Sequence, residues 1–334
     1  MADDDTNVLH ERFSVDSLSD SLRLATHITG TYVELDPAHP TPGSATDAQL
    51  ADELTTATFT FVNTLATDIS SGDFELPSWP EIVVRIKRAL ENDECSVEQI
   101  VRLIGSEPVL AARLLKVVNS KSHNGGEPIK DLRTAVNQLG VDVVRGVAIS
   151  IAAEQSCHDH DLGSVKPYLA ELWQHSVQVA SIAHILAEQF TKITPDEAYL
   201  AGLLHDIGKL YVLIRIQDNP VFIDNERTLR EIMDAWHTTI GEAIMESWKF
   251  SEKLVAAVRD HELYDLEGVR APNLTDVVSV ANLLANQQNA ESRDQVDLKK
   301  IPACRRLKLH TMIGVEVMRI SEKKIQGLHQ LLGI

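Results

Sequence analysis

The chain has 334 residues, of which 44% are hydrophobic and 24% charged, a balance typical of a soluble globular protein with about two domains. Its 49 acidic residues outnumber the 31 basic ones and give a formal net charge of −18. This charge argues against general nucleic-acid binding, because that affinity depends on Lys and Arg replacing phosphate counterions. The three cysteines include no C-x-x-C pair, which argues against a disulfide scaffold and a cysteine-based zinc finger.

The N-terminal part of the chain is acidic. Residues 1–75 contain fourteen Asp and Glu residues but only two Arg. The first residues lack the basic and apolar regions of a signal peptide. The most apolar stretch, residues 143–153, is shorter than the roughly 20 residues that a membrane-spanning helix needs. We therefore expect a cytoplasmic protein without a membrane span.

A helix is predicted inside this acidic segment. A proline-rich turn at residues 36–43 is followed by Leu50, Leu54, Phe61 and Leu65, which recur at helical spacing. The pattern predicts a helix over roughly 47–70. No residues in 1–73 indicate chemistry, so we interpret this stretch as an acidic helical segment of unknown function that docks or regulates.

From Leu76 onward the apolar residues follow a helical period almost without a break. Ser96 with Gln99, and Thr194 with Glu197, predict capping boxes at two helix starts. Helices are predicted to start after Ser96 and Thr194, and others to cover about 80–90, 108–118, 132–139, 166–190, 226–247, 252–263 and 274–289. No alternating apolar run predicts a strand, and the fold class is therefore all-α.

The sharpest chemical signal is the segment from Leu203 to Lys209, which contains His205 followed directly by Asp206. Such a doublet offers two metal ligands, and a carboxylate can bridge two ions. Lys209 lies one turn after His205, where its ammonium could meet a phosphate. Gly208 within the helical pattern indicates close packing. A hydrogen-bonded core histidine is the alternative interpretation of His205.

Other histidines strengthen the metal hypothesis. His175 lies on the apolar stripe of its predicted helix, where a buried imidazole needs a partner. Glu171 precedes it by four residues and can face the same way. His237 and His261 lie in two later helices. Four helices could thus direct ligands to one point, as metal-binding helical bundles do.

Several ordered motifs together resemble an HDOD domain. The resemblance begins with Leu76–Glu81, Ser96–Ile100, Glu107–Ser120 and Ile129–Gly140. The second half resembles an HD-superfamily bundle through Trp173–Ser176, Leu203–Lys209 and Gly241–Trp248. The resemblance covers about 76–290. It implies an HDOD domain over 74–290, with an HDOD-specific helical half at 74–160, an HD-like bundle at 166–290, and a basic helical extension at 291–334.

HDOD domains are bacterial signalling modules related to the HD and HD-GYP phosphohydrolases, and they typically lack much of the metal site. By position, the metal ligands implied by the resemblance are His175, His205, Asp206, His237 and His261, with Glu171, Asp260 and Asn282 as further candidates. Lys209 matches a phosphate-contacting lysine. The chain departs from the HD-GYP pattern, because Asp260 precedes His261 where a second histidine is expected. In addition, Asn282 replaces a late Asp, and no Gly-Tyr-Pro motif occurs.

The resemblance implies an HDOD signalling or regulatory protein whose HD-type module is non-catalytic or vestigial but retains a metal site. The expected partners are signalling proteins or a small phosphorylated ligand. The expected cofactor is one or two divalent ions such as iron or manganese. The sequence is also compatible with an oligomeric protein. The alternative is a metal-dependent phosphodiesterase acting on a nucleotide or cyclic dinucleotide, with Asp206 and Lys209 as its catalytic residues. A metal- or nucleotide-binding sensor without turnover also remains open.

The C-terminal residues reverse the charge of the N-terminus. Residues 299–334 contain eight basic and two acidic residues, a net charge of +6. A solvated helix face is one interpretation of this tail. The other is that the tail folds against the acidic segment or receives an anionic partner.

Overall fold

The computed structural model contains helices and no strand within the residues that it describes. These residues are 45–72, 74, 76, 85, 86, 88, 89, 96–119, 129–139, 144, 148, 163–217, 219–223, 225–264, 271–289, 297–309 and 311–332. The all-α prediction is confirmed. None of the described helices combines the length and apolar character that a membrane span requires. Most of the acidic segment, and much of the helix predicted at 80–90, lies outside the described residues.

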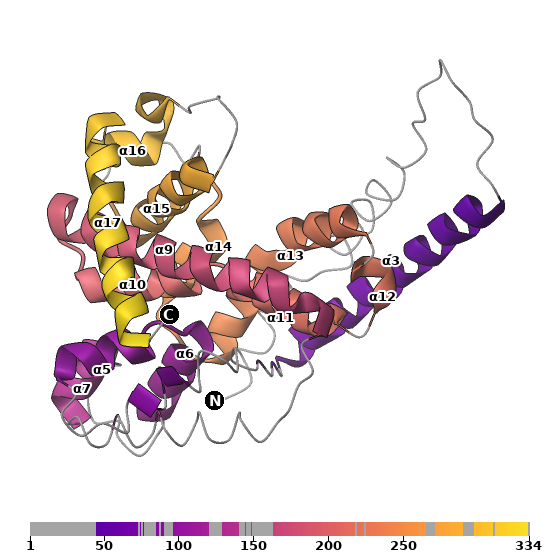
Figure 1. Cartoon of the computed structure of the whole chain (residues 1–334), viewed down its shortest axis with the longest axis horizontal. Helices are drawn as coiled ribbons and strands as arrows, with labels where there is room; N and C mark the ends of the chain where they lie inside the picture. The colour runs from indigo at the N-terminus through magenta and orange to yellow at the C-terminus, as the bar shows by residue number, and fades with distance from the viewer. Residues whose placement is uncertain are drawn as a thin grey trace, which may run out of the picture.

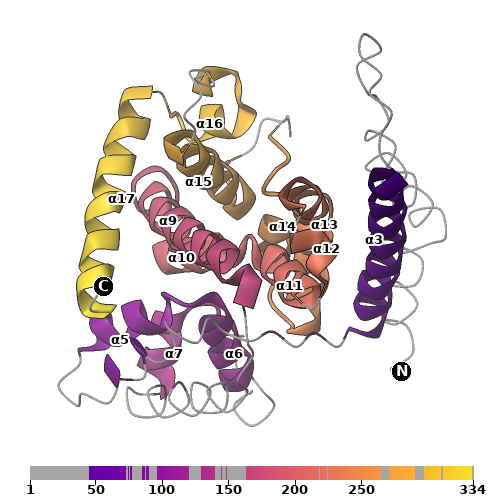
Figure 2. The same ribbon diagram turned by 45° about the vertical axis from the view of Figure 1, so that its right-hand side comes forward.

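Short helices form a layer at the bottom of Figure 2, in the part of the chain where the sequence predicts an HDOD-specific half. They are α5 (Val97–Ile104), α6 (Pro108–Val118) and α7 (Leu132–Leu139). The predicted box at the start of α5 is confirmed, since the Gln99 amide donates to the Ser96 hydroxyl and the Gln99 side chain accepts from the Ser96 amide.

The second half forms a larger bundle around a central helix (Figure 1). This bundle follows the short 3-10 helix η2 (Gly163–Val165) and consists of α9 (Lys166–Phe190), α10 (Pro195–Leu204), α11 (Ile207–Ile216), α12 (Pro220–Ile223), α13 (Glu226–Ser247), α14 (Glu252–Asp260) and α15 (Leu274–Asn289). Helix α9 packs against α10 and α15, while α11 packs against α13. The predicted spans at 166–190, 226–247 and 274–289 match, whereas α14 ends at Asp260 instead of residue 263.

The predicted capping box at Thr194 is wrong. Thr194 is the N-cap residue of α10, but its side chain makes no capping hydrogen bond. The helix nevertheless starts there, because Pro195 fixes a helical φ and the carboxylates of Asp196 and Glu197 suit the positive helix N-terminus.

The turn between α5 and α6 joins the two halves. The Trp173 indole on α9 donates to the Ser106 carbonyl at 2.6 Å, and the Tyr199 hydroxyl on α10 donates to the Gly105 carbonyl at 3.0 Å. Arg133 of α7 donates to Asp196 at 2.7 Å. The layer of α5, α6 and α7 is therefore anchored on α9, which carries His175, and on α10, which His205 follows as the C-cap residue.

Helix α3 (Ala45–Ser71) is the described part of the acidic segment and lies along the side of the bundle near α12 and α13 (Figures 1 and 2). Phe61 packs against Phe222 with ring centroids 5.5 Å apart. The Tyr211 hydroxyl on α11 donates to the Asp68 carboxylate at 2.8 Å and accepts from Arg215 at 2.9 Å. One apolar contact and one polar network thus fasten α3 to the HD-like bundle.

We expect Tyr211→Phe to lower the free energy of unfolding by about 1 kcal/mol, because it removes one hydroxyl from a network that includes charged groups. Asp68 and Arg215 still contact each other at 3.0 Å, which limits the loss. Urea unfolding of the full chain measures the effect. An unchanged free energy would show that the network does not fasten α3.

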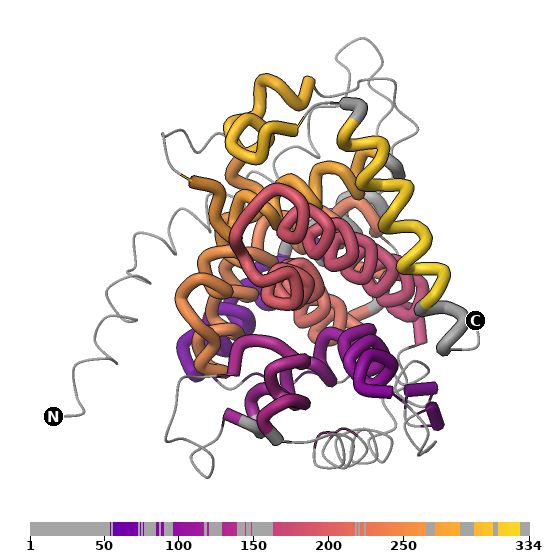
Figure 3. The backbone as a smooth tube through the Cα atoms, turned by 90° about the vertical axis from the view of Figure 1, so that its left-hand side faces the viewer, coloured from indigo at the N-terminus to yellow at the C-terminus, as the bar shows by residue number. Residues whose placement is uncertain are grey.

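The C-terminal extension packs on the opposite side from α3. It consists of η3 (Leu298–Lys300), α16 (Pro302–Arg306) and α17 (Thr311–Leu332), and α17 lies along α9 and reaches α5 (Figures 2 and 3). Arg306 forms a two-bond ion pair with Asp276 of α15, at 2.6 and 3.1 Å, and both side chains are buried. The tail is thus partly a packed element, and α17 does not fold against α3.

Candidate metal centre

The His205–Asp206 doublet lies at the junction of two helices. His205 is the C-cap residue of α10, and Asp206 is the N-cap residue of α11. Both side chains are buried, and the Asp206 side chain is only 1% exposed. The junction therefore holds a carboxylate at the centre of the bundle, where an unpaired charge is costly.

Three other helices bring histidines to the same carboxylate. The Nε2 atoms of His175 on α9 and of His205 lie 3.8 and 3.2 Å from Asp206 Oδ2. The Nε2 atoms of His237 on α13 and of His261, which follows α14, each lie 3.6 Å from Asp206 Oδ1. The five residues that the sequence singled out as principal ligands converge on one point.

The proton positions on three of these histidines suit metal binding. The Nδ1 atoms of His205, His237 and His261 contact the carbonyls of Gly202, Met233 and Val258 at 2.7–3.0 Å. A carbonyl only accepts, so each Nδ1 donates its proton and each neutral ring carries a lone pair on Nε2. This arrangement fixes the tautomer, as backbone acceptors commonly do for ligating histidines.

The Nε2 lone pairs of these histidines have no hydrogen-bond partner among the residues that the structure describes. The Nε2 atoms of His205, His237 and His261 and the Oδ1 atom of Asp206 are buried and make no hydrogen bond. Buried polar atoms without partners are rare and costly, because each loses its bonds to water. Cations bonded to these atoms would remove that cost, and the donors therefore fit one or two divalent metal ions.

The two oxygens of Asp206 face different histidines. His175, His205 and Asp206 form one group of possible ligands, and Asp206, His237 and His261 form another, with the ligand atoms of each group within 4.8 Å of one another. A carboxylate that faces two such groups can bridge two ions or bind one.

The electrostatics keep the centre ready for a cation. Burial lowers the pKa of His205 to about 4 and also lowers the pKa of His175, so both rings are neutral near pH 7. Burial alone would raise the pKa of Asp206, but His205 and the Lys209 ammonium outweigh it and hold that pKa well below its ordinary value. His175, His205 and Asp206 are thus in the deprotonated forms that metal binding requires.

The further candidates lie in different surroundings. Asn282 on α15 joins the cluster, with its Oδ1 3.0 Å from His175 Nε2. Glu171 is 66% exposed and lies 3.6 Å from Arg230. The Asp260 carboxylate accepts two bonds from Arg259 at 2.8 Å. Neither of these two carboxylates belongs to the groups of possible ligands among the described residues.

Two polar residues border the cluster. Lys209 Nζ lies 2.9 Å from Asp206 Oδ2. The lysine that the sequence predicts to contact a phosphate therefore forms an ion pair with the Asp206 carboxylate. Glu262, which the sequence analysis missed, lies 3.5 Å from His237 Nε2. Burial lowers the pKa of His237, but the Glu262 and Asp206 carboxylates outweigh it and raise that pKa. Its position next to His261 was the only sequence signal for Glu262.

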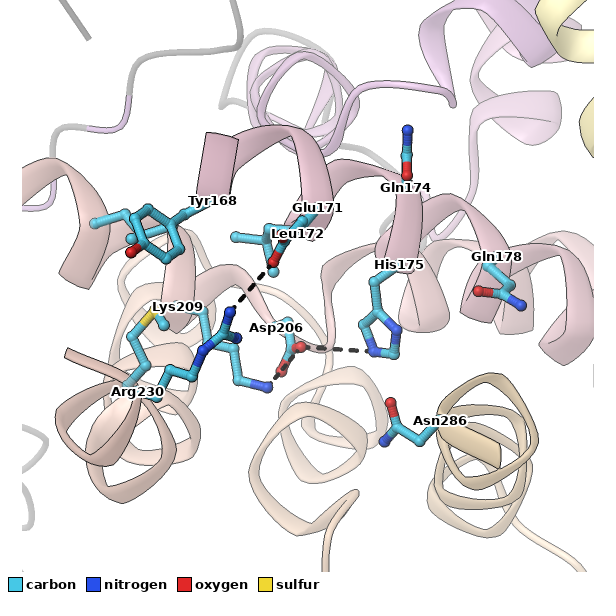
Figure 4. Close-up of a pocket in the computed structure, with 12 residues that line it drawn as sticks. Tyr168, Glu171, Leu172, Gln174, His175, Gln178, Asp206, Lys209, Arg230 and Asn286 are labelled. Carbon is cyan, nitrogen blue, oxygen red and sulfur yellow. Dashed lines mark hydrogen bonds and ion pairs between the residues drawn. The ribbon is translucent and has the colours of Figure 1, made fainter. Parts of the chain in front are cut away.

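An open cleft of about 570 Å³ leads to this centre. Its lining is mostly polar and is drawn in Figure 4; it consists of Tyr168, Glu171, Leu172, Gln174, His175, Gln178, Asp206, Lys209, Leu213, Arg230, Met233 and Asn286. The His175 and Lys209 side chains are partly exposed in this cleft, whereas Asp206 borders it but is buried, as are His205, His237 and His261.

The HDOD family model matches residues 76–264, more than half of the chain, and the protein belongs to the HDOD domain family. An uncharacterized protein of Treponema pallidum (strain Nichols) is 27% identical over 237 residues, which make up 66% of this chain and 44% of that relative. The chain thus spans less than half the length of this curated relative.

Two solved structures illustrate the likeness. The MmoQ response regulator of Methylococcus capsulatus (strain Bath) has a TM-score of 0.59 at 18% identity, covering 74% of this chain and 99% of that one, and shows the same fold. A candidate metal-dependent phosphohydrolase of Shewanella amazonensis SB2B has a TM-score of 0.47 at 22% identity, covering 79% and 97%.

Proposed function

We propose that the protein is an HDOD signalling module that binds a divalent metal in its HD-like half without turning over a substrate. The observation that carries this proposal is the set of buried, unpartnered Nε2 atoms on His205, His237 and His261 around the Asp206 carboxylate. The ligands are His175, His205, Asp206, His237 and His261, and the ion is iron, manganese or a similar metal.

Asn282 favours a role without turnover. Its neutral amide lies beside His175. The catalytically active HD-type proteins that this sequence resembles have an aspartate at that position. An amide oxygen binds a hard cation less strongly than a carboxylate and adds no negative charge. On this view the centre is a structural or sensing element, and its metal stabilises the helices that it joins.

A second candidate function is a metal-dependent phosphohydrolase, which the open cleft at Asp206 and Lys209 favours. A bound metal would supply a water of lowered pKa and a Lewis acid. Asp206 would hold the ion, and the Lys209 ammonium would orient a phosphate of a nucleotide or cyclic dinucleotide. In this function Asp206 and Lys209 are the catalytic residues.

The proposal also includes the domain boundaries, the cellular compartment and the partners of the protein. Residues 1–73 form a docking or regulatory segment, 74–290 the HDOD domain and 291–334 a helical extension. The module acts in the cytoplasm on signalling proteins or a small phosphorylated ligand. The anchoring of α5–α6 on α9 and α10 supports communication between the two halves.

Metal analysis of the full chain tests the proposal. We expect one or two ions of iron, manganese or a similar metal per chain, in protein purified without chelator, and no turnover of cyclic dinucleotides or of bis(p-nitrophenyl) phosphate. Turnover that depends on the metal would establish the second candidate. Protein that holds no metal, even after incubation with each ion, would overturn both.

A further inference from the structure

An ion pair crosses the cleft that leads to the candidate metal centre. Glu171 on α9 and Arg230 on α13 both line the cleft, and Glu171 Oε2 lies 3.6 Å from Arg230 Nη2 (Figure 4). The sequence analysis considered Glu171 as a metal ligand. The structure instead shows its carboxylate in contact with an arginine.

Arg230 is held in place but remains accessible. Its guanidinium donates to Glu226, one turn earlier on α13, at 2.8–2.9 Å, and lies 5.8 Å from the centre of the Tyr168 ring. The side chain is 49% exposed. A guanidinium fixed by a carboxylate and an aromatic ring is pre-organised and keeps further donors for a ligand in the cleft.

The contact of Arg230 with Glu171 is weaker than its contacts with Glu226 and Tyr168. Its 3.6 Å separation is long, and solvent screens an ion pair whose side chains are 49% and 66% exposed. An arginine–phosphate contact, by comparison, is charge-assisted and often bidentate, with two short hydrogen bonds in place of one long contact. A phosphate can therefore replace the Glu171 carboxylate with a net gain.

The cleft offers a second cation to the same ligand. Lys209 lines it together with Arg230 and lies 2.9 Å from Asp206. Each of the two cations contacts a carboxylate of the same cleft, Arg230 that of Glu171 and Lys209 that of Asp206. Together the two cations can receive an anion that carries a phosphate group and competes with these carboxylates.

We propose that Arg230 is an anion-binding residue and that Glu171 is its competing carboxylate, so that the cleft admits a phosphorylated small molecule when its phosphate displaces Glu171. This inference rests on the proposed function, because it places the ligand in the cleft above the metal centre. Glu171 thereby sets the affinity, and ligands without a phosphate are rejected because they leave the ion pair intact.

Inorganic phosphate titrated into the full chain, with binding measured by calorimetry, tests this exchange. We expect Arg230→Gln to weaken binding at least about 10-fold, since one charge-assisted contact is lost. Glu171→Gln should strengthen binding several-fold, since the competing carboxylate is gone. The opposite signs of the two effects distinguish an exchange from a general loss of structure.

A neighbouring ion pair on the same helix supplies matched controls. Arg227 and Glu231 pair at 2.8 Å on α13, and neither lines the cleft. Arg227→Gln and Glu231→Gln make the same charge changes and should alter phosphate affinity less than about twofold, because solvent screens exposed charges. Equal effects from both pairs, wild-type affinity in Arg230→Gln, or no phosphate binding by the wild type would overturn the inference.

Metal content measured on the same samples separates this inference from the proposed function. Metal-loaded protein whose phosphate affinity ignores Arg230 contradicts only the inference. Protein that never holds metal contradicts the proposed function, whatever its phosphate affinity.

Discussion

Gly208→Ala is expected to destabilise the protein by about 3 kcal/mol and to abolish tight metal binding, although the glycine supplies no ligand. A Cβ atom at this position would lie 2.0 Å from the His237 carbonyl oxygen and 2.9 Å from the Gly241 backbone nitrogen. Backbone atoms of α13 cannot rotate away, so α11 and α13 would have to separate. Asp206 starts α11 and His237 lies on α13, and the separation therefore pulls two ligands apart.

Urea unfolding and metal titration of the variant measure both effects. Gly327→Ala is the matched control, because a Cβ atom added at this position of α17 would meet no other atom within 4 Å. That variant should be neutral or up to about 1 kcal/mol more stable, since alanine favours a helix over glycine. Wild-type stability in Gly208→Ala would mean that the helices tolerate separation and that close packing does not build the centre.

The helices were largely predictable from the sequence, because their apolar periodicity and caps are local. The predicted limits of α9, α13 and α15 agree with the structure. The box at Ser96 formed as predicted, whereas the one at Thr194 did not. In both cases the residue types are suitable, and the side-chain geometry, which periodicity does not determine, made the difference.

The candidate ligands were predictable only in part. The sequence named His175, His205, Asp206, His237 and His261, and the structure brings them together. Convergence of four helices depends on long-range packing, such as the contact of Gly208 with α13, and no local spacing encodes it.

The weaker candidates show where helical spacing misleads. Glu171 lies four residues before His175, on the same face but about 6 Å along the axis, where it meets Arg230 across the cleft. Asp260 adjoins His261, and neighbouring helical positions point about 100° apart. Its carboxylate therefore pairs with Arg259 while His261 faces the cluster.

The basic tail shows that the net charge of a segment does not predict where the segment packs. Composition left open both a solvated helix face and a fold against the acidic segment. Among the described residues, Arg306 pairs with the buried Asp276 of α15, and α17 packs on α9. Net charge describes a segment as a whole, whereas docking depends on which charge is buried beside which partner.

Asp206→Asn is expected to weaken metal binding by more than about 100-fold, because changes outside the ligand shell alone already cost 10- to 100-fold. The substitution keeps the shape of the side chain but removes the negative charge that faces all four histidines. Isothermal titration with manganese and iron measures the affinity. Thermal unfolding provides a second readout, since an ion at 100 times its Kd stabilises the wild type by about 2.7 kcal/mol but should stabilise the variant by less than about 0.4 kcal/mol.

Asp260→Asn is the matched control, because it removes the same charge beside another histidine, His261. Comparing the two variants distinguishes metal ligation by Asp206 from a general effect of negative charge near the cluster. Its carboxylate is bound to Arg259, which also contacts Glu242 at 3.0 Å, so the variant should bind metal within about twofold of the wild type. Equal losses in the two variants would mean that net charge near the cluster, and not ligation by Asp206, governs binding. Full affinity in Asp206→Asn would place the metal elsewhere and leave the buried Nε2 atoms of His205, His237 and His261 without the partner that we assign to them. A selective loss in Asp206→Asn, with thermal stability of the metal-free variant retained, assigns the ion to Asp206, because Asp260 carries the same charge but is 21% exposed and is held by Arg259.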